Sequence, residues 1–288
     1  MSDNLFSASA SLDRKSWGFQ LYTKVISTAP EWVLRAIFSP NLMRCMINQR
    51  ADTERYLHDA AKAPLEAMRA RVRKEPGLAA IFFSGLVSQN GAINFDHMTK
   101  TKTVDGILSS ASAPAMEKIV SLFRDLVVRP DTEDQKVADS HRRMLTDMLV
   151  STVRSCNKQQ LDTVDPDALK TWLKQLLLTL MEFAYFDPDP TVKEDTVPRP
   201  PVSEASRVMF QSRLSSSLAH ILSARLDEEI SLPYAVVSAL HSRGESQETS
   251  RLSLQANKQV WKTLKRAYKT LKKIASQVRH LPKDSLKP

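Results

Sequence analysis

The residues best suited to chemistry in this sequence are basic side chains near its C-terminus. Residues 258–288 contain ten of the 41 lysines and arginines but only one of the 32 acids, Asp284. The remaining residues, 1–257, therefore hold equal numbers of each sign, and the whole net charge of +9 lies in the last tenth of the chain. A charge asymmetry of this kind indicates a polyanionic partner such as nucleic acid.

Apolar residues are interleaved with these basic residues at helical spacing. Val260, Leu264, Tyr268 and Leu271 recur every three or four residues, which predicts an amphipathic helix with a basic face. We expect that face to bind nucleic-acid phosphates without reading base sequence. Its residues are Lys258, Lys262, Lys265, Arg266, Lys269, Lys272 and Lys273. A packed capping helix, a nuclear import signal, calmodulin capture and membrane-surface binding are alternative uses of the same pattern.

Residues for catalysis or metal binding do not converge in the sequence. The six histidines are isolated from one another and from the two cysteines, so no metal-ligand spacing occurs. Cys45 follows a basic residue but has apolar neighbours, which predicts a buried and inert thiol. Asp165 and Asp167 flank a proline, a pattern typical of turns and helix caps. We therefore predict no catalytic residue, no metal site and no cofactor.

The elements that must position these side chains are predicted to be helices. From residue 16 onward apolar residues repeat at intervals of three and four, and only 6 of 288 residues are glycine. These patterns predict an all-α fold, either a compact bundle or a helical-repeat solenoid. A HEAT- or armadillo-like α-solenoid is favoured, because a single helical core rarely grows to this length.

The chain is expected to contain four segments. Differences in proline content and polarity separate these segments. In none of them is an apolar stretch long enough to span a bilayer, so no membrane partner is expected. The segments are a disordered N-terminus over 1–15, a helical-repeat segment over 16–186, a proline-rich linker or loop over 187–203, and a helical segment over 204–288 that ends in the basic helix.

Two motifs carry a family resemblance. Residues 39–49 read SPNLMRCMINQ and residues 55–61 read RYLHDAA, while residues 91–104 read GAINFDHMTKTKTV. In this order the motifs resemble the signature of the DNA polymerase phi family. The resemblance implies a nuclear, mainly nucleolar, helical-repeat protein of ribosomal RNA transcription and ribosome assembly, with binding near ribosomal DNA. Family members are much longer and carry long acidic tracts, so the chain is expected to be a fragment.

Five polar residues of these motifs are candidate contacts for phosphate or a protein partner. Arg44 and Asn48 lie four residues apart on one predicted helix, and Arg55 follows on the next. Their alternative role is to cap and cross-link the junction between the two helices. Lys100 and Lys102 lie among threonines in a predicted loop over 94–104, which favours phosphate or partner binding over packing.

Together these features predict a non-catalytic nucleolar scaffold that binds ribosomal DNA or pre-rRNA and ribosome-assembly or transcription factors. The first alternative is a DNA-directed DNA polymerase, as the family name states, although neither D-x-x-S-L-Y-P nor Y-G-D-T-D occurs in the sequence. The second is a pure protein-interaction module, such as a regulator that binds transcription factors. The oligomeric state stays open.

Overall fold

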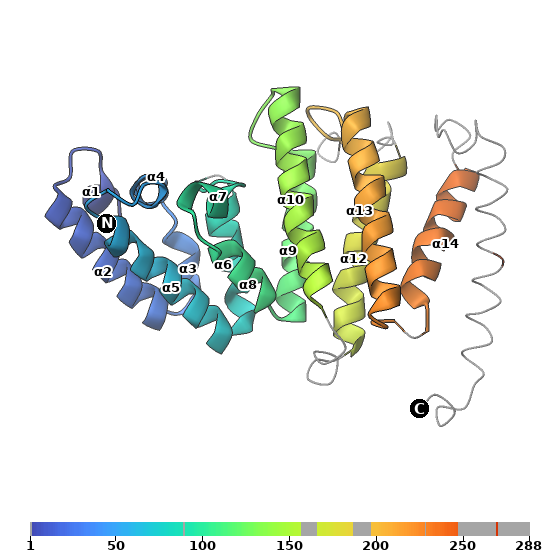
Figure 1. Ribbon diagram of the computed structural model, residues 1–288, viewed down its shortest axis with the longest axis horizontal. Helices are drawn as coiled ribbons and strands as arrows, with labels where there is room; N and C mark the ends of the chain where they lie inside the picture. The colour runs from blue at the N-terminus through green and yellow to red at the C-terminus, as the bar shows by residue number, and fades with distance from the viewer. Residues whose placement is uncertain are drawn as a thin grey trace. The chain divides into compact units, whose positions relative to one another are not determined.

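The computed structural model describes residues 2–88, 90–156, 166–186, 197–227 and 229–246 together with Lys269 (Figure 1). These residues form helices and turns without a strand, which confirms the predicted all-α class. The chain divides into two compact units, Met1–Leu126 and Val127–Pro288. Within the described ranges, no helix has the length and apolar character needed to cross a lipid bilayer.

Unit 1 is built from short and medium-length helices. They are α1 (Ser2–Phe6), α2 (Leu12–Thr28), α3 (Glu31–Ala36), α4 (Pro40–Ala51), α5 (His58–Lys74), the 3₁₀ turn η1 (Pro76–Leu78), α6 (Ala79–Val87), α7 (Phe95–Thr99), α8 (Thr103–Ser109) and α9 (Ala113–Val128), whose last two residues belong to unit 2. In this unit α5 packs against α2, α4 and α8, and α6 packs against α3 and α8.

The first residues of the chain differ from the predicted disorder over 1–15. Phe6, at the end of α1, is 2% exposed, and its ring centroid lies 5.0 Å from that of Phe19 and 5.4 Å from that of Tyr22. Ser11 caps α2 by accepting a hydrogen bond from the amide of Arg14. A single large aromatic residue thus fixes a segment whose small polar composition indicates disorder.

The predicted loop over 94–104 also differs, because it contains α7 and the start of α8. These helices have five and seven residues, fewer than the two turns that a helical repeat of apolar residues needs to be recognised. They bury Phe95, Val104, Ile107 and Leu108. The second motif therefore folds as two short helices, α7 and α8, joined by a turn.

Unit 2 consists of longer helices. They are α10 (Gln135–Ser155), α12 (Pro166–Tyr185), α13 (Glu204–Ser223) and α14 (Ser231–Ser246). Helix α13 packs against α10 and α12, and α12 also packs against α14. The rings of Phe183 and Phe210 lie 5.5 Å apart between α12 and α13.

The proline-rich residues 187–203 connect helices of one unit. Their described part, 197–203, is non-helical, as expected for this composition. However, α12 and α13 on either side pack directly against each other within unit 2. The division into two units lies instead near the end of α9, a continuous helix that no break in composition marks.

Candidate functional site

Most of the predicted basic face lies outside the described residues. Of its members the structure describes Lys269, which is helical and exposed. The other members, outside the described residues, are Lys258, Lys262, Lys265, Arg266, Lys272 and Lys273. The assignment of this face to nucleic acid therefore stays a prediction.

The first motif forms α4 and the turn that leads into α5. Ser39 caps α4 by accepting from the amide of Leu42 at 3.3 Å, and Pro40 occupies the first turn, where its missing N–H costs nothing. Arg44 is exposed and donates to the side chain of Asn41 rather than to Asn48. Asn48 is exposed on α4, and Arg55 is exposed in the turn, not on the helix where we expected it.

The junction between α4 and α5 is held by two residues that the sequence analysis did not select. Arg50 is 7% exposed. Its Nη1 donates to the backbone carbonyl of His58 at 3.2 Å and to Nε2 of the His58 imidazole ring. Nδ1 of His58 lies 3.0 Å from the carbonyl of Asp52, so Nδ1 carries the proton and Nε2 accepts. The expected cross-link thus exists but is made by Arg50 and His58, which leaves Arg44, Asn48 and Arg55 on the surface.

The second motif is organised by the carboxylate of Asp96. Its Oδ1 accepts from the amides of Thr103 at 2.8 Å and Val104 at 3.0 Å, and Oδ2 accepts from the amide of Asp105 at 3.1 Å. These are first-turn amides of α8 that have no partner within the helix. The carboxylate therefore fills the place that an external phosphate would take at a helix N-terminus.

The threonines of this motif are used for packing. Thr99 and Thr103 are 0% and 2% exposed, and Thr101 links their hydroxyl groups at 2.9 and 3.1 Å. Thr101 also donates to Oδ1 of Asp96. Our expectation that these hydroxyls bind phosphate is therefore wrong, because they are satisfied by one another and by Asp96.

The two lysines of the motif remain exposed. Lys100 follows α7 with φ at 52°, a left-handed conformation that lets its amide close the turn on the carbonyl of Asp96. Lys102 immediately precedes α8. Both side chains lie on the surface while the threonines beside them point inward. Of the predicted loop contacts, only the two ammonium groups are available to an anion.

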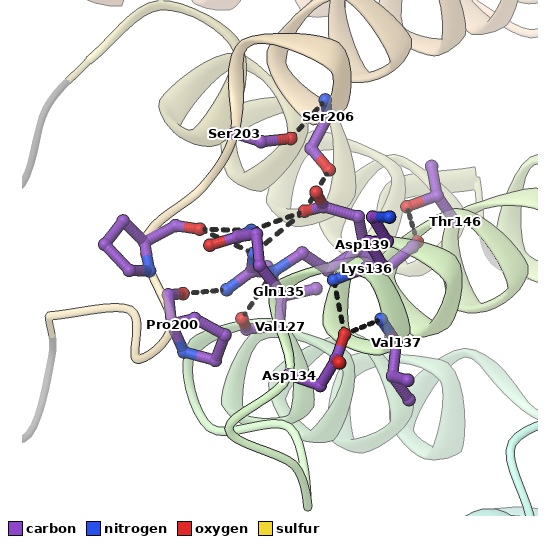
Figure 2. A network of polar contacts seen from close by, with 12 residues as sticks. Val127, Asp134, Gln135, Lys136, Val137, Asp139, Thr146, Pro200, Ser203 and Ser206 are labelled. Carbon is purple, nitrogen blue, oxygen red and sulfur yellow. Dashed lines mark hydrogen bonds and ion pairs between the residues drawn. The ribbon is translucent and has the colours of Figure 1, made fainter.

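A network around a buried arginine holds the proline-rich segment on unit 2 (Figure 2). Arg142 is fully buried and donates to the carbonyls of Val127 and Pro201 at 3.2 and 2.8 Å and to that of Pro200. Its Nη1 also lies 3.2 Å from Oδ1 of Asp139. Burial lowers the pKa of the Arg142 guanidinium, an effect that Asp139 opposes.

Asp139 is the acceptor that joins this network to α13. Its Oδ1 accepts from Oγ of Ser206 at 2.7 Å and from Nε2 of Gln135 at 3.0 Å. Partial burial raises the pKa of Asp139, but hydrogen bonds from Ser206, Ser203, Gln135 and Arg142 outweigh it and lower the pKa overall. Every partner here is supplied by the unit itself, so the network is structural rather than a binding site.

The remaining candidates for chemistry are the two thiols and the side chains that could bind a metal ion. Burial raises the pKa of the Cys45 thiol, and it raises that of Cys156 to about 11, so both stay protonated near neutral pH. No group of three or more histidines, cysteines or acids within the described ranges is placed to hold a metal ion. A groove of about 410 Å³ in unit 1 lies between α3, α6 and α9. Small side chains line it together with the apolar Phe38, Ile81 and Leu122 and the charged Glu31, Arg35 and Lys118.

Comparison with known proteins gives a consistent set of relatives. The family model described as DNA polymerase phi matches residues 1–287. The chain is 28% identical over 293 residues to the rDNA transcriptional regulator pol5 of Schizosaccharomyces pombe, and the match covers 97% of the chain but 29% of that protein. It is 25% identical over 177 residues to the rDNA transcriptional regulator POL5 of Saccharomyces cerevisiae, with 61% of the chain and 17% of that protein covered. No solved structure matches the chain significantly.

Proposed function

This chain belongs to the DNA polymerase phi family, and on that premise we propose that it forms a non-catalytic helical part of a regulator of ribosomal DNA transcription. The observation that carries the proposal is the family match over 1–287, together with two relatives that are both named rDNA transcriptional regulators. The chain spans less than a third of either relative. The proposal therefore concerns the part of such a regulator that this chain represents.

The mechanism that we propose is contact with nucleic acid through charge. Residues 258–288 carry the whole positive excess of the sequence, and Lys269, the member of the basic face that the structure describes, is exposed. Lysines neutralise phosphates as point charges, so this face would hold ribosomal DNA or pre-rRNA without reading bases. Such a partner implies a nuclear and specifically nucleolar location.

The remaining helical surface would serve assembly or transcription factors. We propose that the helices stack as a HEAT- or armadillo-like solenoid, which offers extended surfaces for protein partners. In unit 2 the helices that pack together lie close in sequence, as in α12 with α13 and α12 with α14, and this supports the architecture. Arg44, Asn48 and Arg55 are exposed on unit 1 and are candidates for such contacts.

A charge-neutralised variant of the complete chain tests the nucleic-acid assignment. Glutamine would replace the seven basic residues Lys258, Lys262, Lys265, Arg266, Lys269, Lys272 and Lys273. Binding to mixed-sequence duplex DNA and RNA is measured by fluorescence anisotropy across a salt series. We expect up to seven fewer counterions released, so the slope of log K against log salt becomes less steep by up to about 6 for duplex DNA.

The control for this experiment is a variant with glutamine at seven exposed basic positions elsewhere, including Arg14, Lys24 and Lys118. It matches the change in net charge, so its slope should stay near that of the native chain. An unchanged slope in the C-terminal variant would remove the assignment. Magnesium-dependent extension of a primer by the native chain, abolished by replacing one aspartate, would overturn the non-catalytic part of the proposal.

A further inference from the structure

Three described arginines of unit 1, Arg50, Arg69 and Arg71, have a buried Nε that makes no hydrogen bond, but Arg50 and Arg71 donate through their other guanidinium nitrogens. Arg69 on α5 is half-buried, and its Nε is buried without a hydrogen-bond partner in the described part of the chain. Its guanidinium also forms no ion pair with a carboxylate of the described residues. Because the side chain is only half-buried, the guanidinium keeps part of its surface in solvent, where it is available to an anion from outside.

The position of Arg69 is set by a glycine on the neighbouring helix. A Cβ atom at Gly106 of α8 would lie 2.7 Å from Nε of Arg69 and 3.4 Å from its Cζ. The Arg69 side chain therefore contacts α8 at Gly106, where a larger residue would push this flexible side chain aside. Glycine is unfavourable inside a helix relative to alanine, and the close approach of Arg69 is a packing reason for its presence here.

Three further cations lie a few residues along the chain from Arg69 or from Gly106, which Arg69 contacts. Lys102 precedes Gly106 by one turn of α8, and the amide of Gly106 donates to its carbonyl at 3.0 Å. Lys100 is two residues before Lys102, a separation that the chain cannot extend beyond about 7 Å. Arg73 follows Arg69 by one turn of α5, about 6 Å along the helix axis. Lys100, Lys102 and Arg73 are all exposed.

These four residues define a surface that we call the α5–α8 basic face: Arg69, Arg73, Lys100 and Lys102. The acids near these residues either have another partner or are fewer than the four cations. Asp96 is bound to the amides of α8, and Glu66, one turn before Arg69, is paired with Lys62 at 3.3 Å. Asp105 is the acid that remains exposed on α8. The face therefore keeps a net positive charge.

We propose that the α5–α8 basic face binds the phosphate backbone of a nucleic acid, with the Arg69 guanidinium held over Gly106 as its central contact. This inference rests on the proposed function and adds a second site to it. A phosphate suits the face better than an acidic protein segment, because protein interfaces are built around aromatic or apolar anchors. In unit 1 the most exposed large apolar residues, Trp17, Trp32 and Tyr56, belong to α2, α3 and the turn before α5.

The direct test is nuclear magnetic resonance of the complete chain labelled with ¹⁵N. The Nε–Hε signal of Arg69 is assigned by its loss in Arg69→Lys, and mixed-sequence duplex DNA is then added at low salt. We expect this signal to shift in proportion to the fraction of DNA bound, as measured in parallel by anisotropy. Oligoglutamate of equal charge should leave it in place.

Each other outcome overturns a distinct statement. DNA that binds the chain without moving the Arg69 signal would leave the proposed function standing and remove this inference. A signal that moves with oligoglutamate but not with DNA would assign the face to an acidic protein instead. Absence of any binding to DNA or RNA would remove both the proposed function and this site.

Two variants test the geometry without depending on the spectrum. Arg69→Gln should weaken DNA binding several-fold and make the salt slope less steep by about one, whereas Arg14→Gln on α2, with the same loss of charge, should leave both unchanged. Gly106→Ala keeps the net charge and favours the helix, but its methyl group displaces Arg69. We expect Gly106→Ala to weaken binding as Arg69→Gln does. Native binding by both variants, with folding verified by circular dichroism, would overturn the site.

Discussion

Asp96 shows how a single side chain can account for a motif. An acid beside lysines and threonines suggests an exposed polar loop, yet its two oxygens satisfy three amides of α8 and one hydroxyl group. Its partners lie five to nine residues ahead across a turn, so no local capping rule selects it. The motif therefore mainly stabilises the local fold, and Lys100 and Lys102 are its exposed residues.

Replacing Asp96 should therefore destabilise unit 1. Asp96→Ala leaves the first amides of α8 and the Thr101 hydroxyl without their acceptor, and we expect the free energy of unfolding to fall by about 2 kcal/mol. Urea denaturation followed by circular dichroism measures this loss. Asp105→Asn is the matched control, because the Asp105 side chain is exposed and only its amide contacts Asp96. Equal stability of the two variants would contradict the capping role.

The contact between Arg50 and His58 was also not predicted from the sequence. A cross-linked junction between α4 and α5 was predictable from the motif, but the residues that make it were not. Arg50 lies one position beyond residues 39–49 and is buried, whereas the candidate Arg44 is exposed to solvent. Which side of α4 faces α5 depends on packing with α1, α5 and α7, and this information is spread over segments far apart in the sequence.

At the scale of elements, helical spacing predicted the long helices well. The repeat of apolar residues at intervals of three and four continues through α9, α10 and α12, each at least 16 residues long. The short helices α7 and α8 were not predicted, because they contain too few residues for an apolar repeat to be recognised. The hydrogen bonds that attach residues 199–201 to α9 and α10 were not predicted either. Their acceptors are backbone carbonyls, which every residue type has.

The attachment of this segment predicts a large effect of Arg142. Arg142→Met keeps the apolar volume but leaves the carbonyls of Val127, Pro200 and Pro201 and the Asp139 carboxylate short of donors. We expect a loss of about 3 kcal/mol in the free energy of unfolding of unit 2. Fluorescence of Trp172, which is 2% exposed, reports this unfolding in urea.

Arg143→Met provides the comparison for that experiment. It removes the same charge from the next position of α10, but its side chain is exposed. Its stability should stay within about 0.5 kcal/mol of the native value, as for most surface substitutions. A loss as large as that of Arg142→Met would show that charge in α10, rather than the buried hydrogen bonds, stabilises the unit.

At the scale of the whole molecule, composition and helical spacing predicted the all-α class, but they did not predict where the units divide. Prolines suggested a boundary at 187–203, whereas the division falls near residue 126, within α9. A boundary inside a continuous helix leaves no trace in local composition. The pattern of contacts between helices alone reveals it.

The proposed solenoid has a consequence for the size of the molecule in solution. A compact domain of this length has a radius of gyration of about 19 Å. Repeats that contact only their neighbours give a longer particle, so we expect small-angle X-ray scattering of the monomer to yield a clearly larger radius and an asymmetric distance distribution. A value near that of a compact domain would favour a bundle instead. The profile should be recorded at high salt, where charge on residues 258–288 is screened.

The donors of Arg142 have one more consequence. Pro200 and Pro201 have no N–H of their own, so they can be fastened to a neighbouring helix only through oxygens that another residue must reach. Arg142 donates to both carbonyls, while Gln135 also donates to that of Pro201 at 3.0 Å and the amide of Arg199 donates to the carbonyl of Val128. A substitution at position 142 would thus release the carbonyl of Pro200 and leave residues 199–201 held by the side chain of Gln135 and the amide of Arg199.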